Sequence, residues 1–153
     1  MGKGGELAFR DATRSDLAEV VRLILADSLS AALEAGLDEA APLRAFEAIE
    51  GDANNRLIVA EQDGAIVGTM QLTFIPTLTL RGGWIEQIEN VRIDGSLRSQ
   101  GLGRQMIEWA IERARERGCG LVQLSSNQQR ERAHAFYRRL GFAQSHAGFK
   151  LAL

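Results

Sequence analysis

Arg98-Ser99-Gln100-Gly101-Leu102-Gly103-Arg104 is the stretch from which the fold is worked out, because it joins an alternating segment to a long amphipathic one. Before it, residues 85–93 alternate apolar and polar side chains and are rich in β-branched residues, which predicts a strand. After it, apolar residues recur at helical spacing from Met106 to Ala114. The stretch is therefore predicted to be a tight glycine loop between a strand and a helix N-terminus.

A loop of this composition at a helix N-terminus favours anion binding. The first amides of a helix lack intrahelical acceptors, and the helix dipole adds partial positive charge there. Gly101 and Gly103 carry no Cβ and let a phosphate approach the backbone, while Arg98 and Arg104 add formal charge. Taken alone, the glycine pair fits a plain turn with a helix cap better than a phosphate site.

Two familiar phosphate loops do not fit this stretch. A Walker loop needs Lys-Ser or Lys-Thr after its last glycine, where the chain has Arg104-Gln105, and a GxGxxG fingerprint needs a small residue in place of Met106. The pattern [Arg/Gln]-x-x-Gly-x-[Gly/Ala] does fit. With this pattern the sequence resembles the GNAT superfamily of N-acetyltransferases.

Two further segments carry the same resemblance. Residues 121–127 look like the next strand of that family, ending in a polar residue, and residues 133–142 look like its A-x-x-F-Y-x-x-x-G-F signature. The rest of the chain from about residue 6 is compatible with the family. The ending, Ser145 to Leu153, is also loosely similar to aminoalkylphosphonate N-acetyltransferases.

The resemblance implies an α/β fold with a GNAT-type mixed, mostly antiparallel sheet of about six to seven strands and about four helices on both faces. Strands four and five would run parallel and splay apart at their C-terminal ends. The residues themselves predict a type I′ hairpin at Asp63-Gly64, a doubly buried fifth strand over 119–126, and short closing strands at 142–143 and 148–153. Residues 1–153 are expected to form a single domain with a flexible end at 1–5.

The resemblance also implies a place for acetyl-CoA, in the gap between the splayed strands. Backbone groups of Val91, Arg92 and Ile93 would pair with the pantetheine arm as an added strand pairs with a sheet edge. Core packing is an alternative or additional role for Val91 and Ile93. The pyrophosphate would be held by the glycine loop, whose members are Arg98, Ser99, Gln100, Gly101, Leu102, Gly103 and Arg104.

Three residues further along the chain would complete the cofactor site in the resembled family. Asn127 would contact the pantetheine, and Ala133 and Phe136 would line its arm, although Phe136 also fits simple core packing. No metal is expected, since His134 and His146 have no second ligand at a useful spacing.

Acetyl transfer to an amine needs a proton acceptor and a proton donor. Tyr137 lies in the family motif and is the candidate acid for the departing thiolate, although a mid-helix tyrosine also serves in packing. Glu89 is the candidate base, because alternation places it on one face with Val91 and Ile93. A carboxylate there either takes the proton of the ammonium or holds the ammonium by charge.

Composition sets limits on these expectations. The 153 residues carry a net charge of −2, and 45% are apolar, which is typical of a globular domain and argues against nucleic-acid binding. One cysteine excludes an internal disulfide and favours the cytoplasm, and no run is long enough for a membrane span.

We therefore expect an acetyl-CoA-dependent N-acetyltransferase that acts directly on a small primary amine. Two alternatives stay open, a protein N-acetyltransferase and a non-catalytic acyl-CoA-binding sensor. A homodimer is expected, because the resembled family often joins copies through sheet edges or terminal strands.

Overall fold

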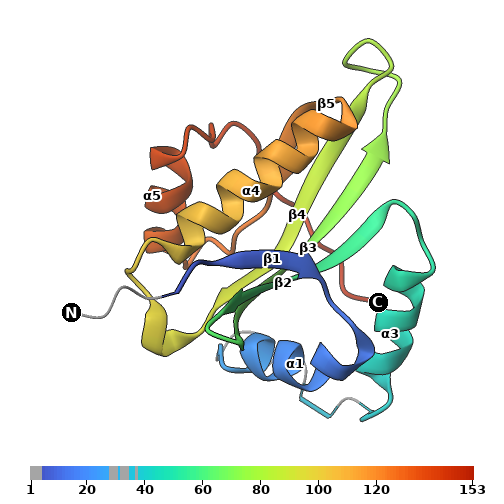
Figure 1. The fold of residues 1–153 in the computed structure, drawn as a ribbon. Coiled ribbons are helices and arrows are strands. Elements are labelled where there is room, and N and C mark those ends of the chain that lie inside the picture. Colours follow the sequence, from blue (N-terminus) through green and yellow to red (C-terminus); the bar gives the residue numbers. More distant parts are fainter. Residues whose placement is uncertain (1–4, 28–30, 32–34, 37) are drawn as a thin grey trace. The chain divides into compact units, whose positions relative to one another are not determined.

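A computed structural model describes residues 5–27, 31, 35–36 and 38–153 of the chain. The chain forms two compact units, Met1–Gln123 and Leu124–Leu153. The first unit carries the sheet and most of the core (Figure 1). The second carries one α-helix, α5, Glu131–Arg139, and the C-terminal segment.

The sheet is mixed, as predicted. Its order is β1-β2-β3-β4-β5, with antiparallel pairing from β1 to β4 and a parallel β4–β5 pair. The strands are β1 Ala8–Asp11, β2 Asn55–Gln62, β3 Ala65–Pro76, β4 Trp84–Ile93 and β5 Cys119–Leu124. The described chain thus has five strands, so the expectation of six to seven is wrong.

The β2–β3 hairpin forms where the sequence predicts it. Its turn residues Asp63 and Gly64 have φ values of 51° and 78°. Positive φ at both central positions is the type I′ geometry, whose twist matches that of the flanking strands. The turn fixes the register of the two long strands at the centre of the sheet.

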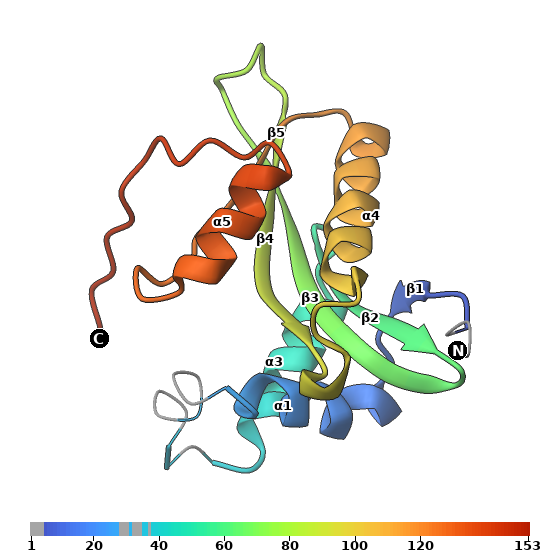
Figure 2. The same ribbon diagram turned by 90° about the vertical axis from the view of Figure 1, so that its left-hand side faces the viewer.

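Helices cover both faces of the sheet. Figures 1 and 2 show α1, Leu17–Leu25, and α3, Ala41–Glu50, on one side and α4, Leu102–Arg117, on the other. α1 contacts β3 and β4, α3 contacts β2, and α4 contacts β4. With α5, the described chain has the α/β architecture and the four helices that were expected.

The core on the α4 side is packed tightly around Gly68 of β3. A Cβ at Gly68 would lie 2.9 Å from Sδ of Met106 in α4 and 3.1 Å from Cδ1 of Ile93 in β4. Met106 and Ile107 are fully buried. Since buried side chains of this size each contribute about 1.5–3 kcal/mol, this contact holds α4 firmly on the sheet.

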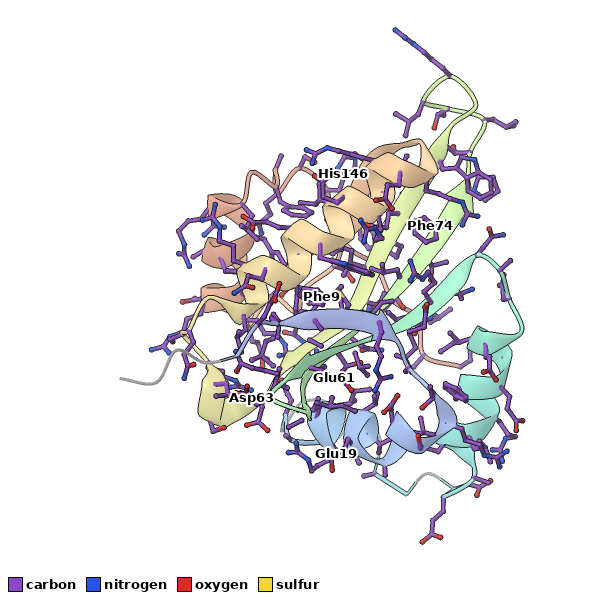
Figure 3. All side chains as sticks on the ribbon, in the orientation of Figure 1. Phe9, Glu19, Glu61, Asp63, Phe74 and His146 are labelled. Atoms are coloured by element: carbon purple, nitrogen blue, oxygen red, sulfur yellow. The ribbon has the colours of Figure 1, made fainter. Side chains whose placement is uncertain are left out.

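The start of α1 is fixed by an ion pair with β1. Arg10 donates to both carboxylate oxygens of Asp16, at 2.6 and 3.0 Å, and also to Glu61 of β2, which is labelled in Figure 3. Asp16 in turn accepts from the backbone amide of Thr13 at 2.7 Å, in the manner of a capping box. The Arg10 hydrogen bonds hold the pKa of Asp16 down at about 2.

The predicted strand structure near the C-terminus is wrong in two respects. Residues 142–153 form no strand, and the apolar side chains of Phe149, Leu151 and Leu153 are 93%, 87% and 118% exposed. β5 ends at Leu124 and is not doubly buried, since Gly120, Leu121 and Gln123 are exposed. Alternation predicts a strand, but a strand forms only where a partner supplies its hydrogen bonds.

In the described ranges, no helix has both the length and the apolar character that crossing a membrane requires.

Candidate active site

β4 carries an irregularity in the stretch that was predicted to meet the cofactor. Thr69 pairs with Arg92 and Gln71 pairs with Glu89, so one residue of β3 faces two of β4. Asn90, one of those two, has a φ of 52°. This is a β-bulge, which leaves an unpaired residue, bends the strand and re-aims the side chains that follow.

Because of the bulge, the side chains of β4 lie on other faces than the sequence predicts. Thr69 and Gln71 are two apart on β3 and share a face, so their partners Arg92 and Glu89 share it too. Ile93 pairs with Gly68 and lies on the α4 face, near Met106. The expectation that Glu89 shares a face with Ile93 is therefore wrong, because an extra residue shifts the alternation.

β4 continues beyond the end of β5. Gln123 of β5 donates from Nε2 to Oε1 of Gln87 at 2.8 Å, so these residues are near each other on the two neighbouring strands. Since β5 ends at Leu124, residues 89–93 of β4 run past it. Residues 89–93 therefore lie beside β3 on one side and extend beyond the end of β5 on the other.

The glycine loop enters α4 through left-handed backbone conformations. Ser99 and Gly101 have φ values of 66° and 80°, and α4 begins at Leu102. The amide of Gln105 donates to the carbonyl oxygen of Gly101 at 3.2 Å, so the helical ladder starts there. The amides of Leu102, Gly103 and Arg104 precede it and point along the helix axis toward the loop.

The connection between β4 and the glycine loop is anchored at Asp94. Its amide donates to the carbonyl oxygen of Val67 at 2.8 Å, and its carboxylate accepts from Ser96 and, at 3.1 Å, from Arg22 of α1. The hydrogen bonds from Ser96, followed by that from Arg22, lower the pKa of Asp94. The loop is thereby tied to both β3 and α1.

The two arginines of the loop differ in their surroundings. Arg104 is exposed and donates from Nε to Glu108 at 2.7 Å, one turn further along α4. Arg98 precedes the positive-φ residues and is also exposed. The two arginine side chains of the loop are thus both at the surface.

The second unit holds the remaining predicted site residues. Tyr137 of α5 packs edge-on against Phe136 and Phe142, with ring centroids 5.1 and 5.7 Å apart. Ala133 lies one turn before them, and helical spacing puts it beside Phe136 and Tyr137. Asn127 accepts from the amide of Gln129 at 2.9 Å, so its side chain shapes the turn that leads into α5.

Glu86 is a further buried carboxyl group in β4. It pairs with Phe74 on the α4 face, away from Glu89, and is 0% exposed. Burial raises its pKa to about 8, and the charges of Arg56 and Arg113 act in the opposite direction. Its position on the other face separates Glu86 from the bulged edge that carries Glu89.

Comparison with known proteins identifies the family. The profile of the acetyltransferase (GNAT) family matches residues 19–142, which is most of the chain. The chain belongs to this family. The GNAT chain is accordingly an acetyltransferase, and the predicted resemblance is confirmed.

Relatives of the GNAT chain match over nearly its full length. Aminoalkylphosphonate N-acetyltransferase of Salmonella typhimurium is 35% identical over 94% of this chain and 90% of its own. Glucosamine 6-phosphate N-acetyltransferase of Trypanosoma brucei brucei is 32% identical over 91% and 99%. A crystal structure of a transcriptional regulator from Bacillus halodurans has a TM-score of 0.92 at 43% identity, covering 97% and 100%.

Sequence reasoning missed the bulge of this GNAT site. The residue that could have indicated the bulge is Asn90, because asparagine tolerates positive φ better than most residues and is rare within strands.

In the described residues, no group of three or more His, Cys, Asp or Glu side chains could hold a metal ion.

Proposed function

We propose that the chain transfers the acetyl group of acetyl-CoA directly to the primary amine of a small molecule. The observation that carries the proposal is the bulged end of β4 running past β5 and leading, through Asp94, into the glycine loop. One continuous piece of chain thus offers a strand that extends beyond its neighbour for an amide-containing arm and a helix N-terminus for its phosphates.

The donor is bound by backbone groups in this proposal. The amides and carbonyls of Val91, Arg92 and Ile93 pair with the pantetheine arm, and the amides from Ser99 to Arg104 hold the pyrophosphate. Asn127, Ala133 and Phe136 of the second unit complete the arm's surroundings, and no metal takes part. The whole chain, residues 1–153, works as one domain.

The reaction needs proton transfers at the nitrogen and at the sulfur. Glu89 accepts the first proton, which the ammonium loses, and the amine nitrogen then attacks the thioester carbonyl carbon. The C–S bond of the tetrahedral intermediate breaks, Tyr137 gives its phenolic proton to the sulfur, which leaves as CoA thiol, and the second proton of the nitrogen returns to the Tyr137 oxygen. A backbone amide near Val91 stabilises the oxyanion. Glu89 is exposed beside the bulge, where a substrate amine can reach it.

The acceptor in this proposal carries both an amine and a phosphorus oxyanion. The two relatives described above are named for an aminoalkylphosphonate and for glucosamine 6-phosphate, which share those groups. Arg92 lies on the same face of β4 as Glu89 and is half-buried. The two side chains therefore offer an anion for the ammonium and a cation for the phosphorus group.

A thiol-release assay with matched amines tests the acceptor. We expect faster CoA release with 2-aminoethylphosphonate and glucosamine 6-phosphate than with ethylamine and glucosamine. Arg92→Met should raise KM for the anionic pair and leave the neutral pair unchanged. Glu89→Gln should lower turnover with all four amines. Equal rates for charged and uncharged members of each pair would contradict the assignment of an anionic acceptor.

A second candidate function is a non-catalytic acyl-CoA sensor. The related Bacillus halodurans structure, named as a transcriptional regulator, favours this candidate. Acetyl-CoA would then stabilise the protein against heat, with no thiol released by any amine. Thiol release with peptides alone would instead indicate a protein N-acetyltransferase.

We also propose a cytoplasmic homodimer. The single cysteine is consistent with a reducing compartment.

A further inference from the structure

A cavity of about 190 Å³ lies between the C-terminal part of α4 and the sheet. It is lined by Phe74 of β3, Arg56 of β2 and three residues of α4, Arg113, Glu116 and Arg117. All five belong to the first unit. Three of the five are arginines, whose guanidinium groups are the side chains that best match the oxygens of an anion.

Aromatic rings hold two of these arginines in place. The guanidinium of Arg117 lies over the rings of Phe74 and Trp84, 4.7 and 4.8 Å from their centroids. The guanidinium of Arg113 lies 4.7 Å from the centroid of Trp109. A guanidinium over a ring still has N–H groups with which to donate hydrogen bonds. These contacts therefore order the two arginines before any ligand binds.

The two arginines of α4 keep unused capacity for an anion. Arg117 donates to the neutral side chain of Asn54 and forms no ion pair within the described part of the chain. Arg113 donates from Nη2 to Glu116 at 2.6 Å, but the Glu116 side chain is 65% exposed, and exposed ion pairs are weak. Nε of Arg113 is buried without a hydrogen-bond partner among the described residues. An incoming oxyanion can therefore displace Glu116.

Glu86 lies beside the cavity and is fully buried on the α4 face of β4. Burial raises its pKa to about 8, while the charges of Arg56 and Arg113 act in the opposite direction. Glu86 is thus mostly uncharged at neutral pH. Arg56 pairs with Asp11 and Arg113 pairs with Glu116, so one of the three arginine charges stays uncompensated.

The cavity and the glycine loop are at opposite ends of α4. The helix has 16 residues, from Leu102 to Arg117, and spans about 24 Å at 1.5 Å per residue. At its C-terminal end the helix dipole opposes an anion, so side chains alone must hold one there. The cavity also faces away from Glu89, which lies on the other face of β4. It is therefore separate from the proposed donor and acceptor sites.

We propose that Arg56, Arg113 and Arg117 form a binding site for a phosphate group, carried either by inorganic phosphate or by a small phosphate ester. Arg56 comes from β2 and the other two come from α4, so the hydrogen-bond donors belong to two elements. A tetrahedral phosphate presents oxygens in several directions, whereas a carboxylate accepts hydrogen bonds mainly near one plane. The bound phosphate would join the end of α4 to β2.

Isothermal titration calorimetry with sodium phosphate, at an ionic strength held constant by sodium chloride, tests the site. Saturable binding is expected, and Arg117→Gln and Arg113→Gln should each weaken it at least about tenfold. Arg115→Gln is the matched control, because it removes the same charge from the same helix at an exposed position that pairs with Glu112. It should bind phosphate as the parent protein does.

Circular dichroism checks that the variants keep their helices. If a glutamine variant fails to fold, Arg117→Lys serves instead, because it keeps the charge but loses the planar fork, and it should also weaken binding. Phosphate bound at the glycine loop would be insensitive to these changes. No saturable binding, binding that the Arg113 and Arg117 variants retain, or an equal loss in Arg115→Gln would overturn the proposal.

Glu86 supplies a second readout. Methyl phosphate is a dianion near neutral pH and above, so its own charge is constant there. As the pH rises through about 8, ionised Glu86 competes for Arg56 and Arg113, and the affinity should fall. Glu86→Gln should remove this fall. Cys119 of β5 is also near Glu86, and burial raises the pKa of its thiol. The same fall in Glu86→Gln would contradict the placement of the anion.

Comparing ligands identifies the source of the phosphate group. Tighter binding of methyl phosphate than of inorganic phosphate supports an ester, and the reverse supports the free ion. Tighter binding of acetate than of either would overturn the assignment of a phosphate. These measurements need neither turnover nor acetyl-CoA, so their failure is distinct from a failure of the proposed acetyl transfer.

Discussion

Glu86 and Phe74 are direct cross-strand partners on the face of the sheet that α4 covers. Arg117 of α4 lies over the Phe74 ring, 4.7 Å from its centroid, while the Glu86 carboxyl group beside it is completely buried. Neither oxygen of this carboxyl accepts a hydrogen bond from the described residues. The charged form of Glu86 is therefore destabilised by burial, and its pKa rises to about 8.

Glu86→Gln is expected to remove a pH dependence of stability. Between the ordinary pKa of 4.5 and the folded value of about 8, the folded protein holds a proton that the unfolded chain releases. The free energy of unfolding therefore falls as pH rises through this window, by at most about 1.4 kcal/mol per pH unit, and levels off above it. Urea unfolding across the window measures this slope. Glu112→Gln, at an exposed site of α4, should keep it; an unchanged slope in Glu86→Gln would contradict the assignment.

Asn90→Val should destabilise the bulge. A β-branched residue tolerates the φ of 52° poorly, and the cost is about 1–2 kcal/mol. Asn90→Gly is the matched control, because glycine adopts this φ without strain. Chemical denaturation compares the two variants. If valine proves as stable as glycine, the left-handed conformation at this position is not required.

Gly103→Glu should weaken CoA binding at least about tenfold, which corresponds to about 1.4 kcal/mol. The glutamate puts bulk and negative charge beside the proposed phosphate site, yet an acidic residue in the first turn suits the α4 dipole, so the helix should remain folded. Isothermal titration calorimetry with CoA measures the affinity. Gln105→Glu adds the same charge on another side of the helix and should have a smaller effect. Undiminished binding by Gly103→Glu would refute the phosphate role of the loop.

Tyr137→Phe should lower kcat by about 10²-fold and leave acetyl-CoA affinity nearly unchanged. The substitution removes only the hydroxyl and keeps the ring that packs on Phe136 and Phe142. Thiol release under saturating substrates gives kcat, and calorimetry gives the affinity. Phe142→Leu disturbs the same ring contact but keeps the hydroxyl, and should retain most of the turnover. Full activity of Tyr137→Phe would leave the acid role without support.

The sequence predicts those turns and helix ends that are determined by residues close together in the chain. Asp63-Gly64 specifies its turn because both residues accept positive φ, and Gly118 ends α4 with a φ of 78°. The start of α4 at the glycine loop was likewise predictable, because apolar spacing and glycine placement both mark it.

Features that depend on a distant partner were not predictable in this way. The bulge at Asn90 exists because β3 sets the register of β4, and the alternation of β4 alone does not contain that register. Alternation puts Glu86 and Glu89 on opposite faces of β4, but it does not indicate that Glu86 is completely buried. The prediction of closing strands was wrong for the same reason, since residues 148–153 have the alternation of a strand but form none in the structure.

The distribution of aromatic residues has a spectroscopic consequence. Both tryptophans of the chain, Trp84 and Trp109, are in the first unit, and arginines of α4 lie over their rings at 4.8 and 4.7 Å. The only tyrosine, Tyr137, is in the second unit. Indole fluorescence therefore reports the docking of α4 on the sheet, and phenol absorbance reports α5. The two units carry separate intrinsic optical probes, so their unfolding can be followed independently without any added label.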